Sequence, residues 1–122
     1  MTVLAALLLQ AAAAPPMPPA DWTNLPELPV AAASGPVSSS FVRREVARNR
    51  CQVEPNGDSL EIAAPVAVLV DEAGAVQRVI PRAIDCPTVE QYTAGYVSSL
   101  ARRAGALKPG WYRFTMTYRW QG

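Results

Sequence analysis

Cys51 and Cys86 are the two cysteines of this 122-residue sequence, and their chemistry is the most specific that it offers. In an exported chain, two cysteines usually pair. A bond between them would stabilise the fold by about 4 kcal/mol on the chain-entropy model. Two buried free thiols or redox chemistry are the alternatives, although no C-x-x-C spacing supports redox chemistry. We predict a structural Cys51–Cys86 disulfide.

Histidine is absent from the sequence, which removes Ser-His-Asp and Cys-His catalysis and imidazole metal sites. Glycine-rich phosphate-binding loops and hydrolase motifs are also missing. Asp71 and Glu72 fall in an expected hairpin turn, and Asp85 stands where it can help to cap the following helix. No spacing places a second carboxylate for acid–base catalysis. The sequence therefore predicts a protein that is not an enzyme and that needs no cofactor or metal.

Arginines near the start of the folded region form one basic stretch around Glu45. Its members are Arg43, Arg44, Arg48 and Arg50. This stretch is either a solvated helix face or a contact for an anionic partner or lipid headgroups. The net charge is only +1, and no aromatic residues are interleaved, so a nucleic-acid partner is not expected.

The N-terminal part resembles an export signal followed by a spacer. Residues 1–14 contain a short apolar run that ends in Ala12 and Ala14, which fits a signal peptide with cleavage after residue 14. The run is too short to cross a membrane, but a start further upstream would add an inner-membrane anchor. Residues 15–40 are rich in Pro and Ala, and we expect an extended linker whose Trp22, Leu25 and Leu28 dock loosely on the domain.

Residues 41–122 carry the pattern of a folded domain. Residues 41–49 have helical apolar spacing after a capping Ser39 or Ser40. Residues 62–71 form a strand that is apolar on both faces, which is typical of a central strand. After a turn, residues 76–81 form an edge strand that ends in a proline.

A long helix and a last strand complete the domain. We expect the helix over 88–104, with a capping box of Thr88 and Gln91. Its buried face is predicted to carry Val89, Tyr92, Tyr96, Leu100 and Ala104. Residues 111–120 alternate between apolar and polar side chains, as in a half-buried strand.

These elements predict an α+β domain of ββαβ type, in which a three-stranded antiparallel sheet packs on one long helix and a short helix precedes it. The long helix returns the chain between the last two strands, so the strand order is second–first–third. The outer side of 111–120 would then be an unpaired edge, able to add an extended peptide by β-augmentation. The side chains that we expect there are Arg113, Thr115, Thr117 and Arg119, although the arginines would equally blunt the edge against aggregation.

Residues 66–120 resemble the C-terminal domain of the TonB family. The resemblance is carried by the strand–turn–strand segment PVAVLVDEAGAVQRV, the helix from Thr88, Lys108-Pro109 and the strand WYRFTMTYRW, after a proline-rich segment. Arg82 to Cys86 stands where the family usually has Ser-Gly. The resemblance implies a periplasmic module that binds an extended peptide of an outer-membrane receptor, in energy-coupled transport.

The alternative is a structural, TolA-like envelope domain with the same fold and no transduction role. Both hypotheses place the protein in the periplasm or outside the cell, with a protein partner. The sequence leaves the oligomeric state and membrane anchoring open.

Overall fold

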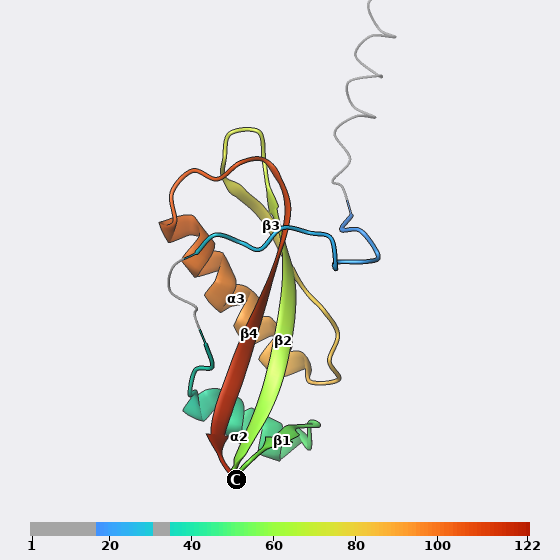
Figure 1. Cartoon of the computed structure of the whole chain (residues 1–122), viewed down its shortest axis with the longest axis vertical. Helices are drawn as coiled ribbons and strands as arrows, with labels where there is room; N and C mark the ends of the chain where they lie inside the picture. Colours follow the sequence, from blue (N-terminus) through green and yellow to red (C-terminus); the bar gives the residue numbers. More distant parts are fainter. Residues whose placement is uncertain (1–16, 31–34) are drawn as a thin grey trace, which may run out of the picture.

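The computed structural model describes residues 17–30 and 35–122. Within these residues the elements are α2 (Ser40–Asn49), β1 (Glu54–Asn56), β2 (Ser59–Val70), β3 (Val76–Pro81), α3 (Pro87–Arg103) and β4 (Gly110–Gln121). The four strands pair antiparallel in one sheet, and the helices pack against one face of it (Figure 1). The predicted α+β class is confirmed. The expected signal segment, 1–14, lies outside the described residues.

β2 is the central strand, as expected. β4 pairs with one side of β2 from Gly110 to Gln121. β1 and β3 both pair with the other side of β2, one at each of its ends (Figure 1). The predicted order is therefore confirmed, with β1 as an additional short strand. This strand arises because Gly57 and Asp58 form a tight turn, across which residues 54–56 pair with 59–61.

Pro65 lies in the middle of β2, a position where proline usually interrupts a sheet. It is opposite Thr115 of β4 and directs its nitrogen away from that strand, into the interval between β1 and β3. Its carbonyl oxygen accepts a hydrogen bond from the Arg82 N–H at 3.0 Å. The missing N–H therefore removes no bond between β2 and β4.

The turn between β2 and β3 is organised by Asp71. Its carboxylate accepts hydrogen bonds from the N–H groups of Ala73 and Ala75, at 2.9 and 3.0 Å. Gly74 has a φ of +81°, and an added Cβ would lie 3.0 Å from the Leu107 carbonyl oxygen. Glycine is therefore required for both the turn and the approach of the α3–β4 loop.

The buried face of α3 differs from the expected one. Tyr92 and Tyr96 are 36% and 42% exposed, whereas Thr93 is fully buried. The Thr93 hydroxyl donates to the Val89 carbonyl oxygen at 2.7 Å and shares a 2.8 Å hydrogen bond with the Tyr118 hydroxyl. Because these partners satisfy the Thr93 hydroxyl, its burial costs little free energy, whereas both tyrosine side chains stay partly exposed.

The start of α3 also differs from the expected one. The capping box of Thr88 and Gln91 does not form. Instead, the Glu90 carboxylate accepts hydrogen bonds from the backbone N–H groups of Ile84 and Cys86, at 3.0 and 3.1 Å. A carboxylate in the first turn also interacts favourably with the helix dipole.

α2 and α3 are joined by the predicted disulfide. α2 begins after Ser39, whose hydroxyl accepts a hydrogen bond from the Val42 N–H at 3.2 Å. It ends at Arg50, which has a left-handed φ of 53°. Cys51 then forms the disulfide with Cys86, with the two Cα atoms 5.6 Å apart. The bond ties the end of α2 to the start of α3.

The core lies between the helices and the inner face of β2 and β4. From β4 it contains Tyr112, Phe114, Met116 and Tyr118, which confirms the expected alternation. One core member comes from the linker, because Leu28 is only 4% exposed and packs in the same cluster. The described part of the linker is thus packed on the domain more firmly than the expected loose docking.

Candidate functional site

The outer edge of β4 is the candidate site, and its geometry follows from the pairing with β2. In an antiparallel ladder, residues alternate between pairs that exchange both backbone hydrogen bonds and pairs that exchange none. Arg113, Thr115, Thr117 and Arg119 occupy alternate positions, opposite residues 67, 65, 63 and 61. Their main-chain groups therefore point away from β2, toward the outer edge.

The upper part of this edge is occupied by the linker. The Arg113 N–H donates to the Pro26 carbonyl oxygen, and the Leu28 N–H donates to the Arg113 carbonyl oxygen, both at 2.9 Å. The bridge between Glu27 and Arg113 is parallel. The expectation that these main-chain groups have no partner is therefore wrong.

A second parallel bridge lies further along β4. The Val37 N–H donates to the Thr117 carbonyl oxygen, and the Arg119 N–H donates to the Val37 carbonyl oxygen, both at 2.9 Å. Thr115 lies between the two bridges, and the linker residues between them include 31–34, which the structure does not describe. The linker therefore pairs with β4 at both ends of this interval.

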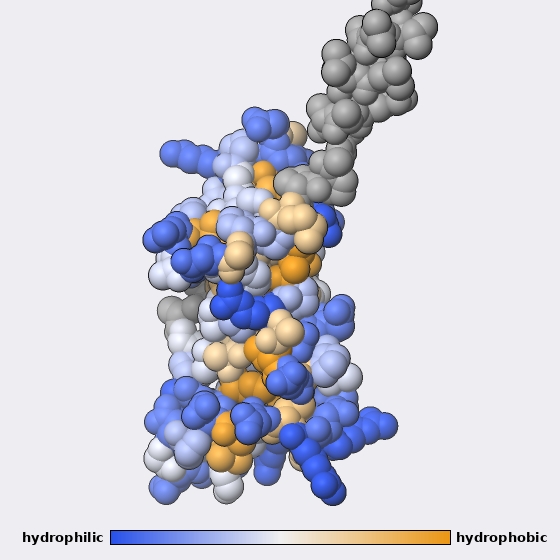
Figure 2. Space-filling view, turned by 90° about the vertical axis from the view of Figure 1, so that its right-hand side faces the viewer, coloured by the Kyte–Doolittle hydropathy of each residue, from blue (hydrophilic) through white to orange (hydrophobic). Residues whose placement is uncertain are grey.

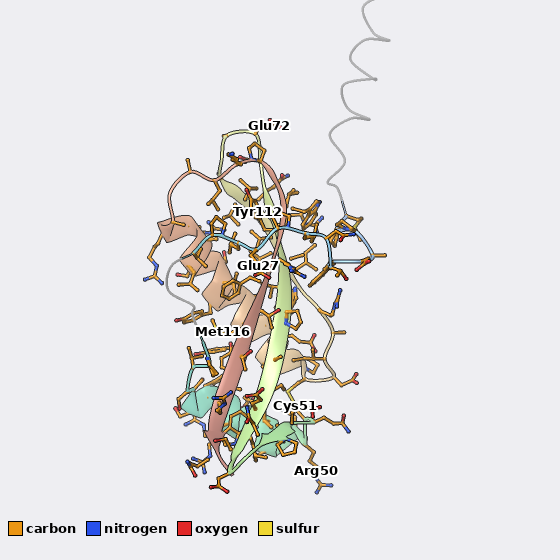
Figure 3. All side chains as sticks on the ribbon, viewed as in Figure 1. Glu27, Arg50, Cys51, Glu72, Tyr112 and Met116 are labelled. Carbon is orange, nitrogen blue, oxygen red and sulfur yellow. A yellow bond between two sulfur atoms is a disulfide. The ribbon has the colours of Figure 1, made fainter. Side chains whose placement is uncertain are left out.

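Glu27 and Arg113 form an ion pair across the first bridge. The Arg113 Nε lies 3.0 Å from the Glu27 Oε1, with the two side chains 38% and 67% exposed. The Nε atom itself is buried, and its N–H is poorly aligned with that oxygen, so the contact is electrostatic rather than a good hydrogen bond. Glu27 lies beside the upper half of β4, where Figure 3 labels it.

Arg119 is paired with β2 rather than free for a ligand. Its Nη2 and Nε lie 2.8 and 3.0 Å from the Glu61 Oε2, directly across the β2–β4 ladder. Hydrogen bonds from Asn56, and then from Arg119, hold the pKa of Glu61 below its ordinary value. This pair fixes the lower end of β4.

Trp22 covers the upper part of the open sheet face, a contact that the sequence pattern did not indicate as part of the site. It is 9% exposed, and the Arg82 guanidinium carbon lies 4.2 Å from its ring centroid. The two side chains line a cleft of about 160 Å³ together with Pro65 and the exposed Thr115. Thr117 is half-buried on the same strand face.

The predicted basic stretch lies on α2, apart from this edge. Arg43, Arg44, Arg48 and Arg50 are all exposed. Arg48 lies 3.5 Å from the Glu45 carboxylate, and Arg50 points into solvent at the lower end of the molecule (Figure 3). A role in binding an anionic partner stays a prediction.

A small aromatic surface lies where α2 meets α3. The rings of Phe41 and Tyr92 stack with centroids 4.7 Å apart, beside a shallow apolar depression that includes Pro87. On the face seen in Figure 2, apolar side chains form small areas broken by hydrophilic ones. The outer edge of β4 is thus a better-defined candidate site than the apolar areas of this surface.

Among residues 17–30 and 35–122, no group of acidic, histidine or cysteine side chains is arranged to hold a metal ion. In the same residues, no helix is long and apolar enough to span a membrane. Comparisons of the chain with family models, curated proteins and solved structures found no match.

Proposed function

We propose that this chain is an exported protein-interaction module that binds an extended peptide by adding it as a strand to the outer edge of β4. The resemblance to TonB C-terminal domains suggests an outer-membrane receptor as the partner and energy-coupled transport as the context. We propose binding rather than catalysis.

The observation that carries the proposal is the pairing of β4 with its own linker. The backbone of Arg113 donates one 2.9 Å hydrogen bond to the linker and accepts another from it. At the second bridge, Arg119 donates a backbone hydrogen bond to the linker and Thr117 accepts one, both also at 2.9 Å. An edge that makes these bonds with one extended chain has the geometry to make them with another.

Two features support export. Residues 1–14 have the composition of a signal peptide, and the Cys51–Cys86 disulfide is of a kind that persists in oxidising compartments. The periplasm is the compartment that the proposal requires.

The second candidate is a structural, TolA-like envelope domain. It is favoured by the burial of Leu28 in the core, which fits a linker that serves as a fixed part of the domain. The two candidates differ in whether the outer edge of β4 ever accepts a second chain.

Amide hydrogen exchange on the full chain tests the proposal, with synthetic N-terminal segments of outer-membrane receptors from the same organism as ligands. We expect protection at the outward-facing Thr115. Thr115→Pro should abolish binding because it removes that N–H, while Thr115→Val should bind normally. The proline removes no bond to β2, since Thr115 faces Pro65 in a pair without hydrogen bonds.

Circular dichroism must first show that the Thr115→Pro variant is folded. Protection confined to the arginine-bearing helix α2 would move the site there and contradict the proposal. Equal binding by both Thr115 variants would also contradict it.

A further inference from the structure

The linker is the only extended segment that the described residues place on the outer edge of β4, and it contacts that edge in a sparse way. Its two bridges are at Glu27 and Val37, ten residues apart, whereas their partners Arg113 and Tyr118 are five residues apart on β4. The linker therefore cannot follow the strand residue by residue. Pro26, Pro29 and Pro36 also lack the N–H groups that a continuous ladder needs.

Specific side-chain contacts hold this interrupted strand at the edge. The carboxylate of Glu27 lies against Arg113, and the next side chain, Leu28, enters the core cluster. Trp22 stacks on Arg82 of the open sheet face. Each contact uses a different chemistry: an opposite charge, an aliphatic side chain in an apolar site and a ring beneath a cation.

We propose that the described linker residues at the edge, 26–30 and 35–37, stand in for the partner peptide. The partner lies parallel to β4, places a carboxylate against Arg113 and an aliphatic side chain at the Leu28 position, and binds by displacing the linker. This inference rests on the proposed function and adds the chemistry of the partner and the competition for the edge.

Displacement has a structural consequence away from β4. The chain that leaves the edge at Leu28 continues back to Trp22, whose ring is buried against Arg82. Trp22 lies outside the core cluster, and the partner's aliphatic side chain takes the place of Leu28 in it, so the displacement leaves the core filled. Partner binding is thereby coupled to exposure of a tryptophan on the opposite face of the sheet.

The probe is a synthetic peptide of residues 24–38, titrated into the full chain. We expect it to bind and to speed amide exchange at Leu28 and Val37 of the chain, because these N–H groups lose their β4 acceptors. The amides of Arg113 and Arg119 should stay protected, since the probe replaces the linker there. Trp22→Ala should bind the probe about tenfold more tightly, because more of the edge is then open.

A charge exchange tests the specificity. A probe with Glu27→Lys should fail on the unaltered chain and bind to the Arg113→Glu variant. Thr23→Ala is the matched control for Trp22→Ala, because it changes an exposed neighbour in the same segment and should leave probe affinity unchanged. Circular dichroism of each variant establishes that the domain is folded.

The results separate this inference from the proposed function. If receptor peptides protect Thr115 while Leu28 and Val37 stay protected, the proposed function stands and the displacement is wrong. If the probe displaces the linker but receptor peptides do not bind, the displacement stands and the receptor as partner falls. If no probe binds any variant, and Arg113 and Arg119 exchange only on global unfolding, the linker is a permanent strand and the inference is overturned.

Discussion

β4 has two neighbours, and they hold it in different ways. β2 pairs with it continuously from Gly110 to Gln121, and the side chains on the helix-covered face of both strands belong to the core. The linker, residues 17–30 and 35–39 in the described chain, pairs with it at two isolated bridges. One strand thus has a continuous ladder on its inner side and an interrupted one on its outer side.

The difference indicates which side of β4 can change while the domain stays folded. Opening the inner ladder exposes core residues such as Phe114 and Met116, so it requires global unfolding. Opening the outer contacts breaks two bridges, an exposed ion pair and the packing of Leu28 and Trp22. Regions with few buried contacts open at lower free energy than the core does, so the outer side should open first.

The largest expected effect is loss of the disulfide, which braces the helix layer behind the inner ladder. Replacing Cys51 and Cys86 by Ser should reduce the free energy of unfolding by about 4 kcal/mol, because the unfolded chain regains conformational entropy when the disulfide no longer closes a loop. The thermal midpoint should fall by roughly 15 to 30 °C. The inner ladder should be lost in this transition, as followed by calorimetry and amide exchange.

Ala47→Ser is the control for that pair, since Ala47 is exposed on the same helix and should change the midpoint little. A double cysteine variant that melts with the unaltered protein would show that the disulfide does not brace the ladder.

A smaller effect is expected from Thr93→Val, which removes a hydrogen bond between α3 and β4 in the core and leaves the linker contacts unchanged. The Tyr118 hydroxyl is buried and loses the partner that lies 2.8 Å away. An unsatisfied buried hydroxyl costs about 1–3 kcal/mol. Denaturant unfolding should show this loss, and the added change Tyr118→Phe should recover part of it. If the double variant is as unstable as the sum of the singles, the hydrogen bond is not the cause.

The smallest effect concerns pH and the lower end of the ladder. Because the folded chain lowers the pKa of Glu61, the stabilisation from this carboxylate is present above the unfolded-state pKa and is lost as pH falls through the folded-state pKa. The titration of the Glu61 carboxyl carbon, followed by NMR, should give a pKa below the ordinary value of a glutamate. Asn56→Ala should raise this pKa, since the Asn56 hydrogen bond is the largest cause of its lowering.

Asn49→Ala is the control for that titration, because Asn49 bonds to Glu45 and Thr88 instead. An unchanged Glu61 titration in the Asn56 variant would assign the effect to Arg119 alone.

Local pattern was sufficient for most of the fold. The strands near 62–71, 76–81 and 111–120, the two helices and the strand order follow from apolar periodicity and turn residues, and the structure confirms them within a few residues. The buried face of α3 was predicted correctly at Val89 and Leu100. At its centre the prediction was one position away, because Tyr92 counts as apolar while Thr93 does not. A hydrogen bond from Tyr118, distant in sequence, reverses that preference.

The occupied outer edge could not be predicted in this way. Prolines and alanines in 15–40 indicate an extended chain, and an extended chain carries no periodic signal for the strand beside which it lies. Only Trp22, Leu25 and Leu28, three large apolar residues in a small-residue segment, indicated docking. That Glu27 lies opposite Arg113 depends on the path of the chain, which local spacing does not determine.

Pro65 has a consequence for how copies of this protein meet. The side of β2 that β1 and β3 leave uncovered contains a nitrogen without hydrogen and a carbonyl already bonded to the Arg82 N–H. A neighbouring molecule therefore finds too few free donors and acceptors there to begin an intermolecular sheet. Pairing between copies is therefore disfavoured at this interval of β2, and an edge-to-edge contact would have to use the outer strands instead.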